Sequence, residues 1–424
     1  MKIYDAKTAL ESILRRKPVF EEQAYLDRVH GVLADVRARG DAALKELTAK
    51  FDRVPLDSFL VTNVSAAYEH VSTEIVASLR LAASRLETFH RRQPLTSWFT
   101  QELGGTLGQI VAPLNRVGCY IPGGTAPLPS TVLHTVTLAR VAGVSEIVVA
   151  TPPNPAFPET EFVNPVILAA ADIAGATEVL RIGGAQAIAA LAYGTESIKS
   201  VDKVVGPGNI YVTLAKKLVY GVVGIDGLAG PTETIVVADE LANPAWVAAD
   251  LLAQAEHDLL ASAILLTPSE ALARAVQSQI SNLLESLSRA DIIAQTFERN
   301  SGIVLTRDLA QAVALADDYA PEHLCLAVRD PWAWVPKIKR AGGLFLGEHS
   351  FEVLGDYLAG PSHVMPTGGS ARFASPLSVL DFVRLTSLVA LDPATTQAIA
   401  AHAARLAQAE QLTAHALAAE RRLA

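Results

Sequence analysis

The chain has 424 residues, is half hydrophobic, and carries a formal net charge of −9 with a mean hydropathy of +0.29. This length exceeds what one simple core accommodates and predicts two or three domains with large apolar interiors. The acidic balance, without a basic tract or an aromatic-basic stripe, argues against nucleic acid as a partner.

The N-terminus, the apolar runs and the cysteines together predict a cytoplasmic protein without a membrane span. Residues 1–5 carry charge and lack an apolar core, so no signal peptide is expected. The longest uncharged run, 117–139, is interrupted by Pro and Gly and does not predict a transmembrane helix. There are two cysteines, Cys119 and Cys325, which indicates no disulfide framework. Cys325 is considered as a nucleophile, although a small buried apolar residue is the favoured interpretation.

The N-terminal quarter is expected to be helical, and a hairpin is expected to follow it. Residues 7–95 read as helices, with apolar residues at helical spacing in 21–51 and 71–92. Residues 105–111 are expected to pair with 117–121, because glycines frame both segments.

From residue 120 onward, strands alternate with helices over short loops, which predicts parallel sheets covered on both faces. The first run has expected strands at 146–150, 178–182 and 203–205 and helices at 130–142, 165–174, 185–192 and 210–220. The second has expected strands at 234–238, 261–266, 302–306, 324–328 and 343–346 and helices at 244–257, 269–288 and 307–319. A helical tail is expected at 377–387 and from 393 to the end. The two runs read as a loose duplication.

Three expected strand-to-helix turns are rich in glycine, at 122–124, 183–184 and 206–208. Such turns let backbone N–H groups approach a phosphate closely. None fits G-x-G-x-x-G with an acidic residue about twenty positions on. Because the turns follow strands of one parallel sheet, they predict a ligand crevice, with plain turn chemistry as the alternative.

Four residues form a candidate metal site. Gln254 and His257 are three residues apart in an expected helix, which places both side chains on one face. With Asp356 and His415 they make a mixed nitrogen and oxygen donor set without thiolate, typical of an open zinc or manganese site. Each alone has an ordinary interpretation, as a solvated pair, a helix cap or an exposed helical residue. Sequence spacing does not show whether the four converge.

Glu322 and His323 are the best acid/base candidates, because a carboxylate beside an imidazole can activate water and shuttle a proton near neutral pH. They follow a proline at the start of an expected strand. A loop salt bridge or a strand cap is the competing interpretation. His363 lies in a Gly-Pro loop, where a substrate contact and a packed loop histidine are both compatible with the sequence.

At these residues the chain resembles histidinol dehydrogenase over nearly its whole length. The matching motifs are, in order, 116–118 with 122–124, 183–194, 205–209, 254–257, 320–324, 355–357, 360–367 and 410–415. Each motif alone is weak, whereas this order and spacing are strongly specific.

The resemblance implies an NAD-dependent, zinc-containing enzyme that oxidises L-histidinol to L-histidine in two hydride transfers through histidinal. It places the zinc ligands at Gln254, His257, Asp356 and His415, with the zinc orienting the substrate imidazole and amine. Within the acid/base pair, it implies that His323 takes the alcohol proton and Glu322 helps to activate water on the aldehyde.

The resemblance also implies which residues contact substrate and cofactor. Substrate-contacting positions fall on Thr232, Gln254, His257, His323, Asp356, His363, Glu410 and His415, and dinucleotide-contacting positions on Tyr120, Gln186 and Asn209. Thr232 stands where the family usually has serine, so it keeps the hydroxyl and adds a methyl group near the substrate. The sequence of the loop 124–129 also differs from the usual family sequence, in a segment whose contact with the cofactor would be affected.

The implied fold class is α/β, with two incomplete Rossmann-like parallel-sheet domains and small helical terminal extensions. The expected parts are an N-terminal extension at 1–19, a main domain from 20–118 and 232–377 that carries most of the metal site, an NAD-contacting domain at 119–231, and a tail at 378–424. The implied assembly is an intertwined homodimer with shared active sites. In it the tail crosses over, so that Glu410 and His415 complete the partner's site.

Three other functions fit part of the pattern. A paralogue oxidising another primary alcohol, such as a sulfonated diol, is disfavoured by the presence of His363 and Glu410. A zinc-dependent hydrolase would suit Glu322 and His323 beside a metal, but it leaves the three glycine turns unexplained. A non-catalytic metal-binding protein is disfavoured because every acid/base and ligand position is filled.

Overall fold

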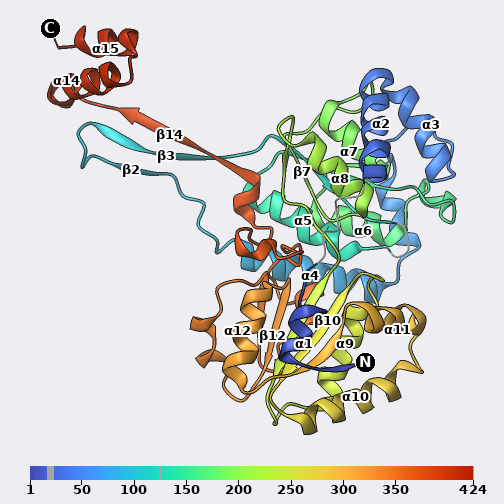
Figure 1. Ribbon diagram of the computed structural model, residues 1–424. Helices are drawn as coiled ribbons and strands as arrows, with labels where there is room; N and C mark the ends of the chain where they lie inside the picture. The colour runs from blue at the N-terminus through green and yellow to red at the C-terminus, as the bar shows by residue number, and fades with distance from the viewer. Residues whose placement is uncertain (17–22, 124–126, 424) are drawn as a thin grey trace.

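The computed structural model describes residues 1–16, 23–123 and 127–423 of the chain. Two α/β lobes lie one above the other, and an arm of strands ending in two helices projects from them (Figure 1). The expected helix start at 21, the domain boundary near 20 and the unusual loop residues 124–126 lie outside the described residues. Within the described ranges, no helix is both long and apolar enough to span a bilayer.

The first lobe is built on a five-stranded parallel sheet with the order β6-β5-β4-β7-β8. Its strands are β4 (Arg116–Tyr120), β5 (Glu146–Thr151), β6 (Glu178–Arg181), β7 (Lys203–Val205) and β8 (Gly224–Ile225). Its connecting helices are α5 (Pro129–Ala142), α6 (Pro165–Ala174), α7 (Gly184–Tyr193) and α8 (Ile210–Val219). In chain order this is 3-2-1-4-5, the Rossmann arrangement, whose switch point lies between β4 and β7.

The N-terminal helices also belong to this first lobe. They are α2 (Gln23–Arg39), α3 (Asp41–Phe51) and α4 (Thr73–His90), with a 3₁₀ turn at Val64–Glu69. Leu44 of α3 shares a core with Ile188 of α7, and Leu86 of α4 shares one with Leu133 of α5. The expected grouping placed 20–118 with 232–377, whereas the apolar faces of these helices pack on α5, α6, α7 and α8, the helices of the first lobe. The single helix expected over 21–51 is divided at Gly40, whose φ is +53°.

The second lobe is built on a six-stranded parallel sheet with the order β1-β11-β10-β9-β12-β13. Its strands are β1 (Ile3–Asp5), β9 (Glu233–Ala238), β10 (Ser262–Thr267), β11 (Gly302–Leu305), β12 (His323–Ala327) and β13 (Gly343–Leu346). Its helices are α1 (Ala6–Glu11), α9 (Pro244–Ala255), α10 (Glu270–Leu284), α11 (Ala290–Arg299), α12 (Leu309–Tyr319) and α13 (Glu352–Tyr357). Strands β9 to β13 repeat the 3-2-1-4-5 order. The predicted α/β class with two Rossmann-like sheets is therefore confirmed.

The arm is a three-stranded antiparallel sheet followed by two helices (Figure 1). Its elements are β2 (Trp98–Thr100), β3 (Thr106–Pro113), β14 (Val383–Ala390), α14 (Pro393–Ala409) and α15 (Thr413–Glu420). The hairpin expected between 105–111 and 117–121 is wrong, because β3 pairs with β2 and β14 instead. All five residues of β4 are buried, as suits a central parallel strand.

The helix expected at 377–387 is also wrong. Residues Val379–Phe382 form one 3₁₀ turn, and the aliphatic run that follows is β14. Its eight residues pair with β3, from Val383 opposite Pro113 to Ala390 opposite Thr106. Pairing with a strand distant in sequence thus overrides the local helical pattern.

A buried ion pair holds the turn that follows β7. Lys216 of α8 is 2% exposed, and its Nζ donates to Asp226 Oδ1 at 2.5 Å and to the Gly206 carbonyl at 2.8 Å. Asp226 Oδ2 in turn accepts from the Gly206 N–H at 2.7 Å. One lysine therefore ties α8, the β7 turn and the loop after β8 together.

The variant Lys216→Met is expected to lower the free energy of unfolding by about 3–5 kcal/mol, because it leaves Asp226 buried without a counter-charge. Urea denaturation of the single variant measures the loss. The double variant Lys216→Met with Asp226→Asn is the matched control, and it is expected to recover part of the stability. A double variant less stable than Lys216→Met alone would contradict this explanation.

Candidate active site

The acid/base candidates lie at the amino ends of β9 and β12, two neighbouring strands of the six-stranded sheet. Glu322 directly precedes β12, His323 is its first residue, and Thr232 directly precedes β9. Ligands of open α/β sheets usually bind at the opposite, carboxyl edge. There the Asp239 carboxylate accepts the backbone N–H groups of Leu241 at 3.0 Å and Arg329 at 2.7 Å. This carboxylate is at the switch point between β9 and β12, whereas the acid/base candidates lie at the amino edge of the same two strands.

Glu322 is held as a buried base. Its Oε2 accepts from the Thr232 hydroxyl at 2.6 Å and from the Glu233 N–H at 3.1 Å. Burial raises the pKa of Glu322 to about 7. Oε1 makes no hydrogen bond within the described ranges, so one carboxylate oxygen is oriented while the other can accept a proton.

His323 is buried with both ring nitrogens lacking a hydrogen-bond partner among the described residues. Its Nδ1 lies 3.7 Å from Glu322 Oε2, and its Nε2 lies 3.8 Å from Asp356 Oδ1. Buried polar atoms normally have partners, so an imidazole of this kind indicates a place where a ligand or a proton is received.

Gln254 and His257 lie at the end of α9, which is shorter than predicted. The helix ends at Ala255, so His257 lies beyond it and faces solvent, whereas Gln254 is fully buried. The helix expected at 244–257 is therefore two residues shorter at its C-terminal end. Gln254 Nε2 donates to the Thr232 hydroxyl at 2.6 Å, which leaves the hydroxyl proton for Glu322 Oε2, and the Gln254 oxygen is directed at Glu352. To bind a metal, its oxygen would have to exchange an internal contact for the ion.

Asp356 and His363 meet beside this cluster. The Asp356 carbonyl can only accept, so the contact of 2.9 Å to His363 Nδ1 places the proton on Nδ1. His363 Nε2 is then an acceptor, 3.4 Å from the Thr131 hydroxyl of α5. The pKa of His363 is lowered by burial, with the charge of Asp356 opposing the shift. His363 is therefore a neutral acceptor at the boundary between the lobes, a contact that the sequence had left open.

Glu352 is a member of this cluster that the sequence reading missed. It hydrogen-bonds to the Thr234 hydroxyl, and its Oε1 lies 3.8 Å from His323 Nδ1. Burial and the charge of Asp356 raise the pKa of Glu352 well above its usual value. The available signal was spacing, because Glu352 and Asp356 are four residues apart on one face of α13.

Two predicted site residues do not join the cluster within one chain. Glu410 caps α14 and His415 lies in α15, both solvent-exposed at the end of the arm (Figure 1). Across the residues that the structure describes, no three His, Cys, Asp or Glu side chains gather as a metal site. Within one chain, the charge of Asp356 opposes the lowering of the pKa of His257, and the Gln254 amide lies against Thr232 and Glu352.

The three predicted dinucleotide contacts lie along the carboxyl edge of the five-stranded sheet. Tyr120 ends β4, and its hydroxyl accepts from the Gly184 N–H at 3.1 Å. Gln186 is in the first turn of α7, and Asn209 caps α8 by accepting from Tyr211 and Val212. Gly206 has a φ of +109°, and a Cβ there would lie 2.2 Å from the Tyr120 carbonyl oxygen. At this edge the glycine turn after β7 comes close to the backbone at the end of β4, which leaves backbone groups free of side chains, as expected where a nucleotide binds.

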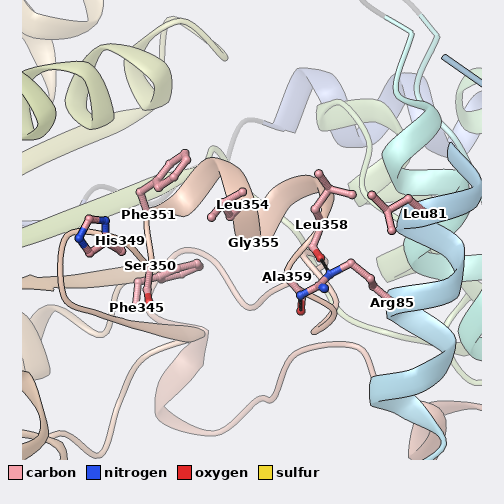
Figure 2. Close-up of a pocket in the computed structure, with 10 residues that line it drawn as sticks. All are labelled: Leu81, Arg85, Phe345, His349, Ser350, Phe351, Leu354, Gly355, Leu358 and Ala359. Atoms are coloured by element: carbon pink, nitrogen blue, oxygen red, sulfur yellow. Dashed lines mark hydrogen bonds between the residues drawn. The ribbon is translucent and has the colours of Figure 1, made fainter. Parts of the chain in front are cut away.

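A hollow of about 380 Å³ lies beside α13, but it does not contain the acid/base pair. Figure 2 shows it between Leu81 and Arg85 of α4 and the chain around α13, with Arg85 directed at the carbonyls of Leu358 and Ala359. Its lining is largely apolar and includes none of the predicted site residues. The hollow therefore gives no reason to place the active site away from the cluster around His323.

Cys119 and Cys325 are both buried and unpaired, as the sequence predicted. Burial raises the pKa of the Cys119 thiol to about 12 and that of Cys325 well above its usual value. Neither thiol is therefore a thiolate near neutral pH, and a nucleophilic role for Cys325 is unsupported.

Comparison with known proteins gives one consistent result. The family profile described as histidinol dehydrogenase matches residues 15–423. The histidinol dehydrogenase of Moorella thermoacetica is 51% identical over 400 residues, covering 93% of each chain. That of Thermus thermophilus is 48% identical, covering 98% of each chain. The crystal structure of histidinol dehydrogenase from Elizabethkingia anophelis superposes with a TM-score of 0.93 at 37% identity, covering 99% of this chain and 97% of that one.

Proposed function

Because this chain belongs to the histidinol dehydrogenase family, we propose that it oxidises L-histidinol to L-histidine through histidinal, with NAD as hydride acceptor and zinc as substrate-orienting ion. Family membership supports an oxidoreductase acting on histidinol in histidine biosynthesis. The observation that carries the site assignment is the buried imidazole of His323 between Glu322 and Asp356, which has no hydrogen-bond partner among the described residues.

His323 would move the proton in the first oxidation. Taking the alcohol proton leaves an alkoxide, from which hydride departs readily. Both imidazole nitrogens lack partners in the described part of the chain, so one can receive the proton while the other faces the carboxylates nearby. The neutral His363 would accept a hydrogen bond from the substrate through Nε2.

Glu322 would act in the second oxidation. Its carboxylate takes a proton from water as the water adds to the aldehyde, which gives the hydrate that is oxidised to the acid. Thr232 and the Glu233 N–H hold Oε2, so Oε1 is the atom that takes the proton. The Thr232 hydroxyl thus donates a hydrogen bond to the carboxylate of Glu322, and a serine hydroxyl at this position would donate the same bond.

The residues present fit a zinc ion once a second chain is included. Gln254 of α9, His257 just after that helix and Asp356 of α13 supply oxygen and nitrogen donors, and the partner's His415 would supply the fourth. Bound zinc would polarise and orient the substrate. Although the His257 side chain is exposed in a single chain, desolvation by the surrounding protein lowers its pKa, which favours the neutral imidazole that binds metal.

A homodimer with exchanged tails would bring Glu410 and His415 to the site. In one chain they lie at the end of an arm that projects from both lobes (Figure 1). The arm exposes large apolar side chains, including Leu385 at 58%, Val389 at 67% and Leu406 at 68%. Exposed apolar surface on this scale is typical of an interface, so a second copy of the chain is the proposed partner.

The proposed function is tested by incubating zinc-loaded protein with L-histidinol and NAD and following NADH. Two NADH per histidinol are expected, because two oxidations separate the alcohol from the acid. Chelation is expected to abolish NADH formation, and added zinc, but not calcium, to restore it. If folded, dimeric, zinc-loaded protein forms no NADH from histidinol, another primary alcohol becomes the substrate to seek.

A further inference from the structure

Asp52 is a half-buried carboxylate that the proposed chemistry does not use. It follows α3, where its N–H caps the helix by donating to the Thr48 carbonyl. Burial raises the pKa of Asp52 to about 6. No Lys or Arg forms an ion pair with it among the described residues. A carboxylate withdrawn from water without a cation is costly, unless a ligand supplies hydrogen bonds to it.

The position of Asp52 relates it to the nucleotide crevice. Its Oδ2 lies 3.5 Å from the Nε2 of Gln186, which is 2% exposed. The charge of Asp52 also contributes, after burial, to the raised pKa of Tyr120. Asp52 is therefore beside two of the three proposed dinucleotide contacts, although it comes from a helix far away in the sequence.

The strand order indicates which half of a dinucleotide would lie there. In the Rossmann arrangement a carboxylate after the second strand binds the adenosine ribose hydroxyl. Here the second strand is β5, and the residues that follow it, Pro152 and Pro153, carry no carboxylate. Tyr120 reaches from β4 to the Gly184 N–H after β6, so its ring spans the side of the sheet that includes β5. Asp52 contacts Gln186 on this same side.

We propose that Asp52, directly after α3, replaces the missing strand-end carboxylate and accepts a hydrogen bond from the adenosine ribose 2′-hydroxyl of the dinucleotide. This inference rests on the proposed use of NAD. A carboxylate accepts from the free 2′-hydroxyl of NAD, whereas it repels the 2′-phosphate of NADP. Asp52 is thus the residue that selects NAD over NADP.

Calorimetric titration of the zinc-loaded enzyme with NAD, 2′-deoxy-NAD and NADP tests this role. The unchanged enzyme is expected to bind 2′-deoxy-NAD about tenfold more weakly than NAD, the effect of one charge-assisted hydrogen bond. Asp52→Asn is expected to bind NAD about tenfold more weakly, to bind 2′-deoxy-NAD as before, and to discriminate less against NADP. Asp57→Asn, an exposed carboxylate five positions on, is the matched control and is expected to change nothing.

Equal weakening of NAD and 2′-deoxy-NAD in Asp52→Asn would show a merely structural role and overturn the inference. If that variant does not fold, the unchanged enzyme still decides, because equally tight binding of NAD and 2′-deoxy-NAD would exclude a hydroxyl contact. Failure of the unchanged enzyme to bind any dinucleotide would instead refute the proposed function. The two failures are therefore distinguishable.

Discussion

Replacing Glu322 with glutamine is expected to slow the oxidation of histidinal about a thousandfold, within the range that removal of a general base produces. The amide keeps the shape of the side chain and its acceptor oxygen toward Thr232, but it cannot take a proton from water. Oxidation of the alcohol, assigned to His323, is expected to fall less. Supplying histidinol and histidinal separately, and measuring NADH from each, resolves the two steps.

The same carboxyl group predicts a pH dependence. Because burial raises the pKa of Glu322 to about 7, its basic form is scarce below that pH and predominates above it. The rate with histidinal is therefore expected to rise as pH increases from 6 to 8, and Glu322→Gln is expected to lose this rise. Glu240→Gln, at the opposite edge of the sheet and exposed, should behave like the unchanged enzyme. Unaltered oxidation of both substrates by Glu322→Gln would show that Glu322 is not the base.

If the tails are exchanged between subunits, combining two variants that are each inactive with histidinal is expected to restore the oxidation of histidinal. Glu322→Gln damages the lobe that carries the acid/base pair, and His415→Ala damages only the tail. Each variant alone is expected to lose about a hundredfold or more, the latter through loss of a proposed metal ligand. In a mixed dimer, the intact lobe of the His415→Ala chain meets the intact tail of the Glu322→Gln chain.

The recovered activity has a defined size. Random exchange gives about half mixed dimers, each with one complete site of two, so about a quarter of the unchanged activity is expected. Unfolding and refolding the variants together allows exchange, while mixing them folded is the control. Unchanged protein unfolded and refolded alone checks that refolding is efficient. No recovery after exchange of the single variants would show that each tail serves its own chain.

The local pattern of apolar residues was sufficient to place most strands of the two parallel sheets. The apolar runs that became β5, β7, β9, β12 and β13 were placed within a residue or two, because parallel strands buried on both faces need continuous hydrophobic residues. The start of β12 was predicted within one residue, at 324 against the observed His323, since a proline before an apolar run marks the boundary. Composition, strand and helix alternation, and motif order therefore determined the fold class and the family.

Local pattern failed where a segment depends on a distant partner. Residues 383–390 have helical as well as strand character, and only pairing with β3 makes them a strand. The helix α4 carries an apolar face that fits either lobe, and only packing against Leu133 and Ile147 assigns it to the first. Backbone hydrogen bonding and burial decided both cases, and neither is encoded in the segment itself.

For the candidate site too, some features follow from the sequence and others only from the tertiary structure. The sequence by itself determined which side chains can do the chemistry, namely Glu322, His323 and the nitrogen and oxygen donors, because reactivity belongs to residue type. Only the tertiary structure decided their states, by burying Glu322, leaving His323 without partners and placing Asp52 beside Gln186. The physical reason is that a side chain's pKa and hydrogen bonding depend on the groups around it, which folding brings from distant parts of the chain.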